Sequence, residues 1–147
     1  MLPCPCYTRI FKGKESMLDR QQVIKYRIQK SWETYNASKV LIDTKYYSSA
    51  LNRIYYACFY MVLALLLTKD LDSSKHSGVK SLFNKNFVNP GCVNQKWGSF
   101  YSNLFINRQE ADYEDLNDIT AEFINLRLKE AFGFLIELET FINQKSE

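Results

Sequence analysis

Residues 54–67 read IYYACFYMVLALLL, fourteen consecutive side chains that carry no charge. A membrane-spanning helix needs about 20 apolar residues, so a run of this length is typical of a helix in a protein core. The run has almost no polar face, which predicts a helix from about Tyr46 to Thr68 at the centre of a helical bundle. We therefore expect no membrane-spanning segment.

The segments on either side of this run have helical periodicity. A peripheral amphipathic helix is predicted from about Arg20 to Ile42, and a polar loop over residues 69–78. A short helix is predicted from about Val79 to Phe87, and the turn sequence Asn89-Pro90-Gly91 that follows marks its end. The apolar positions of the first helix are spaced by three and four residues: Ile24, Ile28, Trp32 and Tyr35.

Two further helices are predicted in the second half of the chain. One carries an apolar stripe from Trp97 and ends near Arg108 or slightly beyond. An acidic connector over residues 111–118 follows, and Asp118 is a suitable N-cap for the last helix. That helix has a heptad seam suited to antiparallel packing: Ile124, Leu128, Ala131, Leu135, Leu138 and Ile142. A second stripe needs another partner, inside the domain or across a dimer: Phe123, Phe134 and Phe141.

The composition favours one all-α domain. The 147 residues include only 5 Gly and 3 Pro, which is typical of long helices. We predict an antiparallel bundle of four to five helices over residues 17–147, with residues 1–16 as a tail and Met17 as an alternative start. The first residues lack an apolar stretch long enough for a signal peptide, so we expect a cytoplasmic protein.

Charge and cysteine content exclude several classes of site. The net charge is +3 without a run of like charges, which is typical of a solvated surface. Cys4 and Cys6 have the wrong spacing for a zinc knuckle, and the chain has a single histidine. Cys58 lies in the apolar run, where a cysteine is a small core residue. We therefore expect reduced thiols, no metal and no cofactor.

Arg108 interrupts the apolar stripe that begins at Trp97. It occupies the position four residues after Leu104, where the stripe should continue. A guanidinium group on a core-facing stripe must be paired, reach solvent or line a cleft. Two interpretations follow: an ion pair with Asp112 one turn later, or a functional cleft around Arg108.

Three segments together resemble HEPN domains. They are YYSSALNRIYYACFY at residues 46–60, KHSGV at 75–79 and RQEADY at 108–113, and the resemblance covers about residues 20–142. It implies a helical bundle that dimerises and pairs with a minimal nucleotidyltransferase as toxin and antitoxin. By this resemblance, many related proteins are metal-independent ribonucleases that carry an arginine, four to six intervening residues and then a histidine. In those enzymes the arginine holds the phosphate, and the histidine is the general acid or base.

This sequence departs from the ribonuclease motif after Arg108. Positions 112 and 113 are Asp and Tyr, and the single histidine, His76, precedes Arg108 by about thirty residues. An active enzyme would need His76 or Tyr113 as its base, because an adjacent arginine lowers the pKa of Asp112. The alternatives are that His76 caps the next helix or is exposed in its loop, and that Tyr113 is structural. By resemblance, Tyr113 is also a candidate target for adenylylation by the partner.

Arg53 and Asn52 complete the candidate site. Arg53 either extends to the surface from the central helix or lines the same cleft as Arg108. Asn52 is either a buried hydrogen-bonding residue or a ligand contact. The first functional interpretation is a HEPN–nucleotidyltransferase component that binds nucleotide or RNA through Arg108, Arg53 and Asn52. The second is an endoribonuclease that uses Arg108 with His76 or Tyr113. The third is a purely structural module, and we favour the first.

Overall fold

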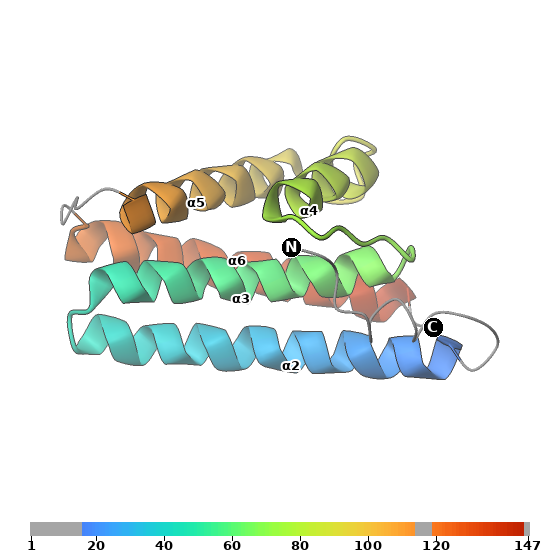
Figure 1. Ribbon diagram of the computed structural model, residues 1–147, viewed down its shortest axis with the longest axis horizontal. Coiled ribbons are helices and arrows are strands. Elements are labelled where there is room, and N and C mark those ends of the chain that lie inside the picture. Colours follow the sequence, from blue (N-terminus) through green and yellow to red (C-terminus); the bar gives the residue numbers. More distant parts are fainter. Residues whose placement is uncertain (1–15, 114–118, 146–147) are drawn as a thin grey trace.

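The computed structural model describes residues 16–113 and 119–145 of the chain, and within these ranges it contains helices and no strand (Figure 1). The predicted tail lies outside the described residues, apart from Ser16. The elements are α2 (Ser16–Asp43), α3 (Tyr47–Leu67), α4 (His76–Phe83), the π-helical turn η1 (Asn84–Val88), α5 (Gln95–Tyr113) and α6 (Ala121–Lys145). The all-α prediction is confirmed.

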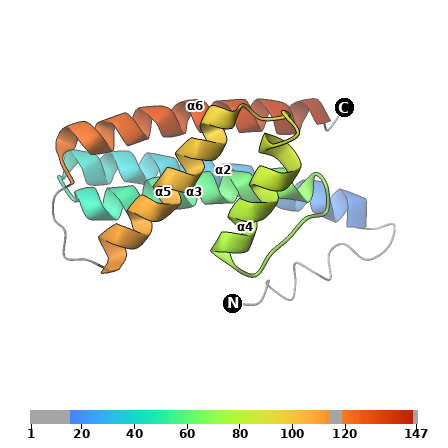
Figure 2. The same ribbon diagram turned by 90° about the horizontal axis from the view of Figure 1, so that it is seen from above.

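The three longest helices, α2, α3 and α6, pack against one another as a bundle, and α4 and α5 lie across α3 and α6 on the side away from α2 (Figures 1 and 2). Helix α2 is antiparallel to both α3 and α6, whereas α3 and α6 run in the same direction, and α5 crosses them obliquely (Figures 1 and 2). The first pair is joined by a tight turn in which the N–H of Tyr46 donates to the carbonyl of Leu41 at 2.8 Å. Lys45 in this turn has a φ of 65°.

Small side chains allow α2 and α3 to approach closely. Ala50, Ala57 and Ala64 repeat at heptad spacing on α3, and all three are fully buried. On α2, Ser31 is buried, and its hydroxyl donates to the carbonyl of Ala57 at 2.7 Å. This hydrogen bond satisfies the buried hydroxyl and links the two helices.

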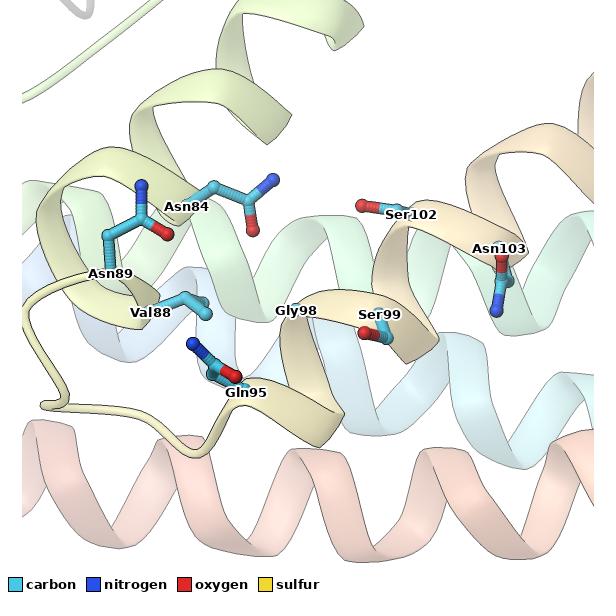
Figure 3. A pocket seen from close by; sticks show the side chains of 8 residues that line it. All are labelled: Asn84, Val88, Asn89, Gln95, Gly98, Ser99, Ser102 and Asn103. Carbon is cyan, nitrogen blue, oxygen red and sulfur yellow. The ribbon is translucent and has the colours of Figure 1, made fainter.

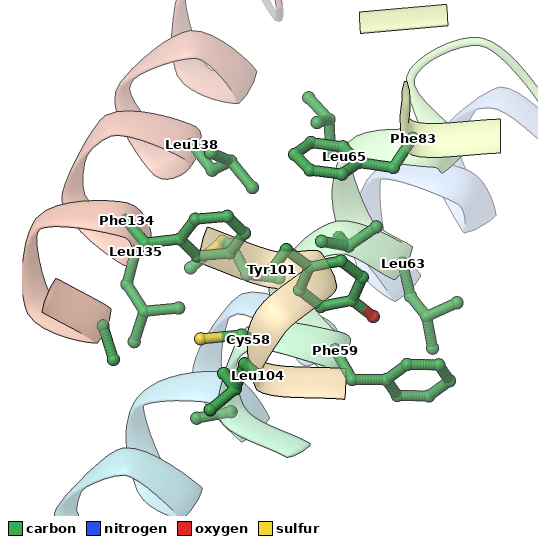
Figure 4. Packing of buried hydrophobic residues seen from close by; sticks show 14 of the residues in the cluster. Cys58, Phe59, Leu63, Leu65, Phe83, Tyr101, Leu104, Phe134, Leu135 and Leu138 are labelled. Carbon is green, nitrogen blue, oxygen red and sulfur yellow. The ribbon is translucent and has the colours of Figure 1, made fainter. Parts of the chain in front are cut away.

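The core is centred on α3, as the uncharged run predicts. By length and composition α3 is the one helix among the described residues that could cross a membrane. However, 78% of its most apolar stretch of 18 residues is buried in the bundle. The seam of α6 is also buried, apart from Leu128, which is half-buried. Phe134 of α6 is fully buried among α3, α4 and α5 (Figure 4). The second aromatic stripe therefore finds its partner inside the domain at Phe134, and at Phe141, which packs on Phe87.

Several predicted boundaries were wrong. His76 is the first residue of α4, not part of the loop, and the short helix divides at Phe83 into α4 and η1. The fifth predicted helix begins at Ala121, where the Thr120 hydroxyl accepts a hydrogen bond from the N–H of Phe123 at 3.1 Å. Thr120 therefore caps α6, and Asp118, the predicted N-cap, lies outside the described residues. Helix α5 continues to Tyr113, into the segment predicted as a connector.

Candidate functional site

Arg108 continues the stripe of α5 by packing on aromatic rings of α3. Its guanidinium carbon lies 4.7 Å from the ring centroid of Tyr55 and 5.8 Å from that of Tyr56. A cation over an aromatic face is attracted by the negative charge of the ring, and this attraction grows as water is excluded. The aromatic face explains how a half-buried arginine is tolerated at this position.

His76 contacts the same two rings from α4. Its Nδ1 and the Tyr55 hydroxyl are 2.9 Å apart and share a hydrogen bond. The imidazole stacks on Phe59 with centroids 4.4 Å apart and meets Tyr56 edge-on at 5.7 Å. His76 is therefore neither an exposed loop residue nor distant from Arg108, although the two are 32 positions apart in the sequence.

Arg53, which lies on α3, also contacts Tyr56. Its guanidinium carbon lies 5.0 Å from the Tyr56 centroid, and its Nη2 donates to the Asn52 side-chain oxygen at 2.7 Å. Arg53 and Arg108 thus contact one ring, although they come from different helices. We call the group formed by Arg53, Tyr55, Tyr56, His76 and Arg108 the tyrosine-pair site.

Burial sets the protonation states of the site. It raises the pKa of Tyr55 to about 12, and the neighbouring Tyr101 and Arg108 only partly oppose this. Burial, followed by the charge of Arg108, lowers the pKa of His76. At neutral pH the site therefore holds a neutral phenol and a neutral imidazole beside the guanidinium of Arg108. When Nδ1 carries the imidazole proton it donates to Tyr55 Oη, and Nε2 is then able to accept a proton.

A cavity of about 330 Å³ opens beside the tyrosine-pair site, next to Arg53. It is lined by Leu41, Ser48, Ser49, Asn52 and Arg53, so hydroxyl and amide groups accompany the cation. The guanidinium group of Arg53 and these hydrogen-bond donors suit an anionic ligand such as a phosphate group. Among the described residues, no group of three or more His, Cys, Asp or Glu side chains is placed to hold a metal ion.

The structure brings together four of the predicted residues: Asn52, Arg53, His76 and Arg108. The side chains of Asp112 and Tyr113 lie outside the described part of the structure. The predicted Arg108–Asp112 ion pair and both roles of Tyr113 therefore stay predictions.

Sequence reasoning did not single out three residues of this region. Tyr55 and Tyr56 entered only as part of a family-like segment, although two consecutive tyrosines in an apolar run are a recognisable signal. Lys80 lies one turn after His76 on α4, and its ammonium group is 4.6 Å from the Phe105 centroid. The spacing of His76 and Lys80 would have placed them on one face, had α4 been predicted to begin at residue 76.

The positive charge of Arg108 makes a testable contribution to the pKa of His76. We expect the pKa of His76 to lie below 6.5, and Arg108→Gln to raise it, because a neutral side chain no longer opposes protonation. Proton NMR during a pH titration measures this directly, since His76 is the single histidine of the chain. Arg127→Gln, which removes an arginine that packs on Phe123 instead, should leave the pKa unchanged. Equal pKa values of His76 in wild type and Arg108→Gln would contradict the placement of Arg108 beside His76.

The lowered pKa of His76 also determines the direction in which the free energy of unfolding changes with pH. The unfolded chain binds a proton at His76 at about pH 6.5, whereas the folded chain does so only at lower pH. The free energy of unfolding therefore decreases as the pH falls from about 6.5 through the folded pKa.

Residues 24–140 match the HEPN domain family. A UPF0332 protein of Thermotoga maritima is 40% identical over 126 residues, which cover 86% of this chain and 96% of that protein. Two proteins of Methanocaldococcus jannaschii, each named "Putative toxin", are also similar. One is 33% identical over 119 residues, covering 81% of both chains. The other is 34% identical over 126 residues, covering 86% of this chain and 88% of that protein.

Proposed function

Because the chain belongs to the HEPN domain family, we propose that it is the toxin-like partner of a minimal nucleotidyltransferase and binds RNA or nucleotide phosphate at the tyrosine-pair site. The observation that carries this proposal is the contact of Arg53 and Arg108 with one tyrosine ring from two different helices. The names of two relatives, each a "Putative toxin", agree with such a role.

The proposed ligand follows from the chemistry of the site. Guanidinium groups donate two parallel hydrogen bonds to phosphate oxygens, and their planar fork makes this geometry specific. Tyr56 is half-buried, so one part of its ring supports the arginines while another part is open to solvent. A nucleotide phosphate between Arg53 and Arg108 would lie beside the cavity that contains Asn52.

The test is binding of fluorescein-labelled single-stranded RNA and of labelled ATP, measured by anisotropy in EDTA at two salt concentrations. We expect binding that weakens as salt rises, because cations displaced from phosphates are released into the solution. Binding of neither ligand at low salt would overturn the proposal and leave a purely structural module.

A second candidate function, cleavage of RNA without metal, is favoured by the position of His76. A neutral imidazole beside Arg108 is suited to take the proton of a ribose 2′-hydroxyl while the arginine holds the adjacent phosphate. The 2′-oxygen then bonds to phosphorus, the bond from phosphorus to the 5′-oxygen breaks, and that oxygen receives a proton. The expected products are a 2′,3′-cyclic phosphate and a 5′-hydroxyl end.

His76→Gln separates binding from cleavage. Glutamine keeps hydrogen-bonding capacity but does not accept a proton, so we expect loss of RNA cleavage by about 100-fold or more with little change in RNA affinity. Gel analysis of end-labelled RNA in EDTA measures cleavage, and anisotropy measures affinity. Cleavage at the wild-type rate by His76→Gln would exclude His76 as the base and leave Tyr113 as the candidate.

The partner and the dimer are part of the same proposal. We expect a homodimer in analytical ultracentrifugation and a stable complex with the nucleotidyltransferase. If the partner adenylylates Tyr113, incubation with the partner and ATP should add one AMP to the wild type and none to Tyr113→Phe, as measured by mass spectrometry. AMP addition to both proteins would place the modification on another residue.

A further inference from the structure

A polar pocket separate from the tyrosine-pair site lies between η1 and the first half of α5 (Figure 3). Its volume is about 460 Å³. In Figure 3 the amide of Asn84 and the hydroxyl of Ser102 point toward one another across the opening. Eight residues line it, of which six carry a neutral amide or hydroxyl group and none carries a charge: Asn84, Val88, Asn89, Gln95, Gly98, Ser99, Ser102 and Asn103.

The backbone builds this pocket in two ways. The carbonyl of Asn84 accepts a hydrogen bond from the N–H of Asn89 at 2.8 Å, five residues later, so the helix widens into a π turn. Gly98 then allows α5 to approach η1, because a Cβ atom there would lie 2.8 Å from Val88 Cγ1 and 3.1 Å from Asn84 Oδ1. A larger residue at position 98 would push the two walls apart.

The amide side chains of the pocket are available to a ligand. Within the described residues, Asn84, Asn89, Gln95 and Asn103 form no side-chain hydrogen bond with another protein group. Each amide offers a carbonyl acceptor and two N–H donors. The lining contains no cation to pair with a free phosphate or carboxylate. It is therefore suited to a neutral ligand with alternating donors and acceptors.

The pocket lies where η1, which continues directly from α4, meets the first half of α5. The tyrosine-pair site takes His76 from α4 and Arg108 from α5, and its other residues from α3. On α5, Ser102 precedes Arg108 by six residues, a separation of about 9 Å along the helix axis. The two helices diverge from the pocket toward the ends that carry Arg108 and His76 (Figure 2). Between the two sites, Lys80 of α4 packs on Phe105 of α5, which places a third cation on this path. A short single strand can therefore bridge the two sites.

We propose that this pocket, which we call the amide pocket, binds one nucleobase of the RNA strand whose phosphate lies at Arg108, and so selects the sequence that is bound. The proposal rests on the proposed function. Side-chain amides of Asn and Gln pair with the edges of bases, and an unpaired base of a single strand exposes those edges. The tyrosine-pair site would supply affinity without sequence preference, and the amide pocket would supply the preference.

The test compares four labelled six-nucleotide homopolymers of A, C, G and U. We expect the wild type to prefer one base by roughly 10-fold, the range of one good amide–base pair. The double variant Asn84→Ala/Ser102→Ala should bind all four within about 3-fold of each other. Asn143→Ala, which removes an exposed amide from α6, should keep the preference. Arg108→Ala should weaken binding of all four oligonucleotides alike. Thermal melting of each variant establishes that it is folded.

A second measurement separates this proposal from the proposed function. Free nucleosides carry no phosphate, so their effect on the side-chain amide NMR signals of Asn84 and Asn103 reports on the amide pocket alone. Equal binding of the four oligonucleotides by the wild type, or a preference that survives in the double variant, overturns base selection by the amide pocket but not phosphate binding at the tyrosine-pair site. If nucleosides shift these signals but RNA does not bind, base binding at the amide pocket is retained and phosphate binding at the tyrosine-pair site is overturned. If nucleosides cause no shift and RNA does not bind, both proposals are overturned.

Discussion

Replacing Arg108 by alanine is expected to weaken binding of single-stranded RNA by about 10- to 100-fold. A hydrogen bond from a charged group contributes about 1.5–3 kcal/mol, and each 1.4 kcal/mol is a factor of ten in the dissociation constant. The expected loss is large because Arg108 is half-buried against Tyr55, so its charge is less screened than that of a surface lysine. Fluorescence anisotropy with labelled RNA at fixed salt measures the change.

Two further variants show whether charge or geometry accounts for the loss. Arg108→Lys keeps the charge but not the planar fork, so we expect an affinity between those of wild type and Arg108→Ala. Lys129→Ala removes an exposed charge from α6 and should change affinity by less than about 2-fold. If Arg108→Ala and Lys129→Ala bind RNA equally well, Arg108 is not part of the binding site.

Phe134→Ala is expected to lower the free energy of unfolding by about 3–5 kcal/mol, the range for removal of a large aromatic side chain from a core. The Phe134 ring is fully buried, and its loss would leave a cavity where α4 and α5 pack on α6. Its centroid lies within 6.0 Å of four other rings, those of Phe83, Trp97, Phe100 and Tyr101. Urea denaturation followed by circular dichroism measures the change.

Phe132 provides a matched control on the same helix. Its side chain is 49% exposed, and Phe132→Ala should lower the free energy of unfolding by no more than about 1 kcal/mol. The difference between the two variants then reports on burial, since the chemical change is identical. Equal losses for Phe132→Ala and Phe134→Ala would contradict the packing described for α6.

The sequence predicts most of the fold because the long helices bury regular patterns. The uncharged run identified α3 as the central helix, and the heptad seam of α6 identified its buried face. Short elements were less predictable. Helix α4 begins at His76 without a side-chain cap, so no cap residue marks its start. The π turn at Asn84 depends on one hydrogen bond to Asn89, and hydrophobic periodicity does not reveal such a bond.

The candidate site was predictable as residues but not as an arrangement. Arg108 was found because a charge on an apolar stripe breaks a pattern. The proximity of His76 to Arg108 depends on how α4 and α5 cross α3, and on Tyr55, which both residues contact. Long-range packing of this kind leaves no local signal in a single sequence. The amide pocket was missed for the same reason, since its walls come from two separate segments.

The burial of α3 has a consequence for genetics. Fourteen of the 21 residues of α3 are buried, and Tyr55 is one of them. In a screen for loss of the proposed toxicity, inactive alleles in α3 will therefore fall into two groups, proteins that fail to fold and folded proteins that lack only the tyrosine-pair site. Arg53 and Tyr56 are half-buried, so alleles at these two positions report on the site with the least interference from misfolding. Measurements of soluble protein abundance would sort the remaining α3 alleles into the two groups.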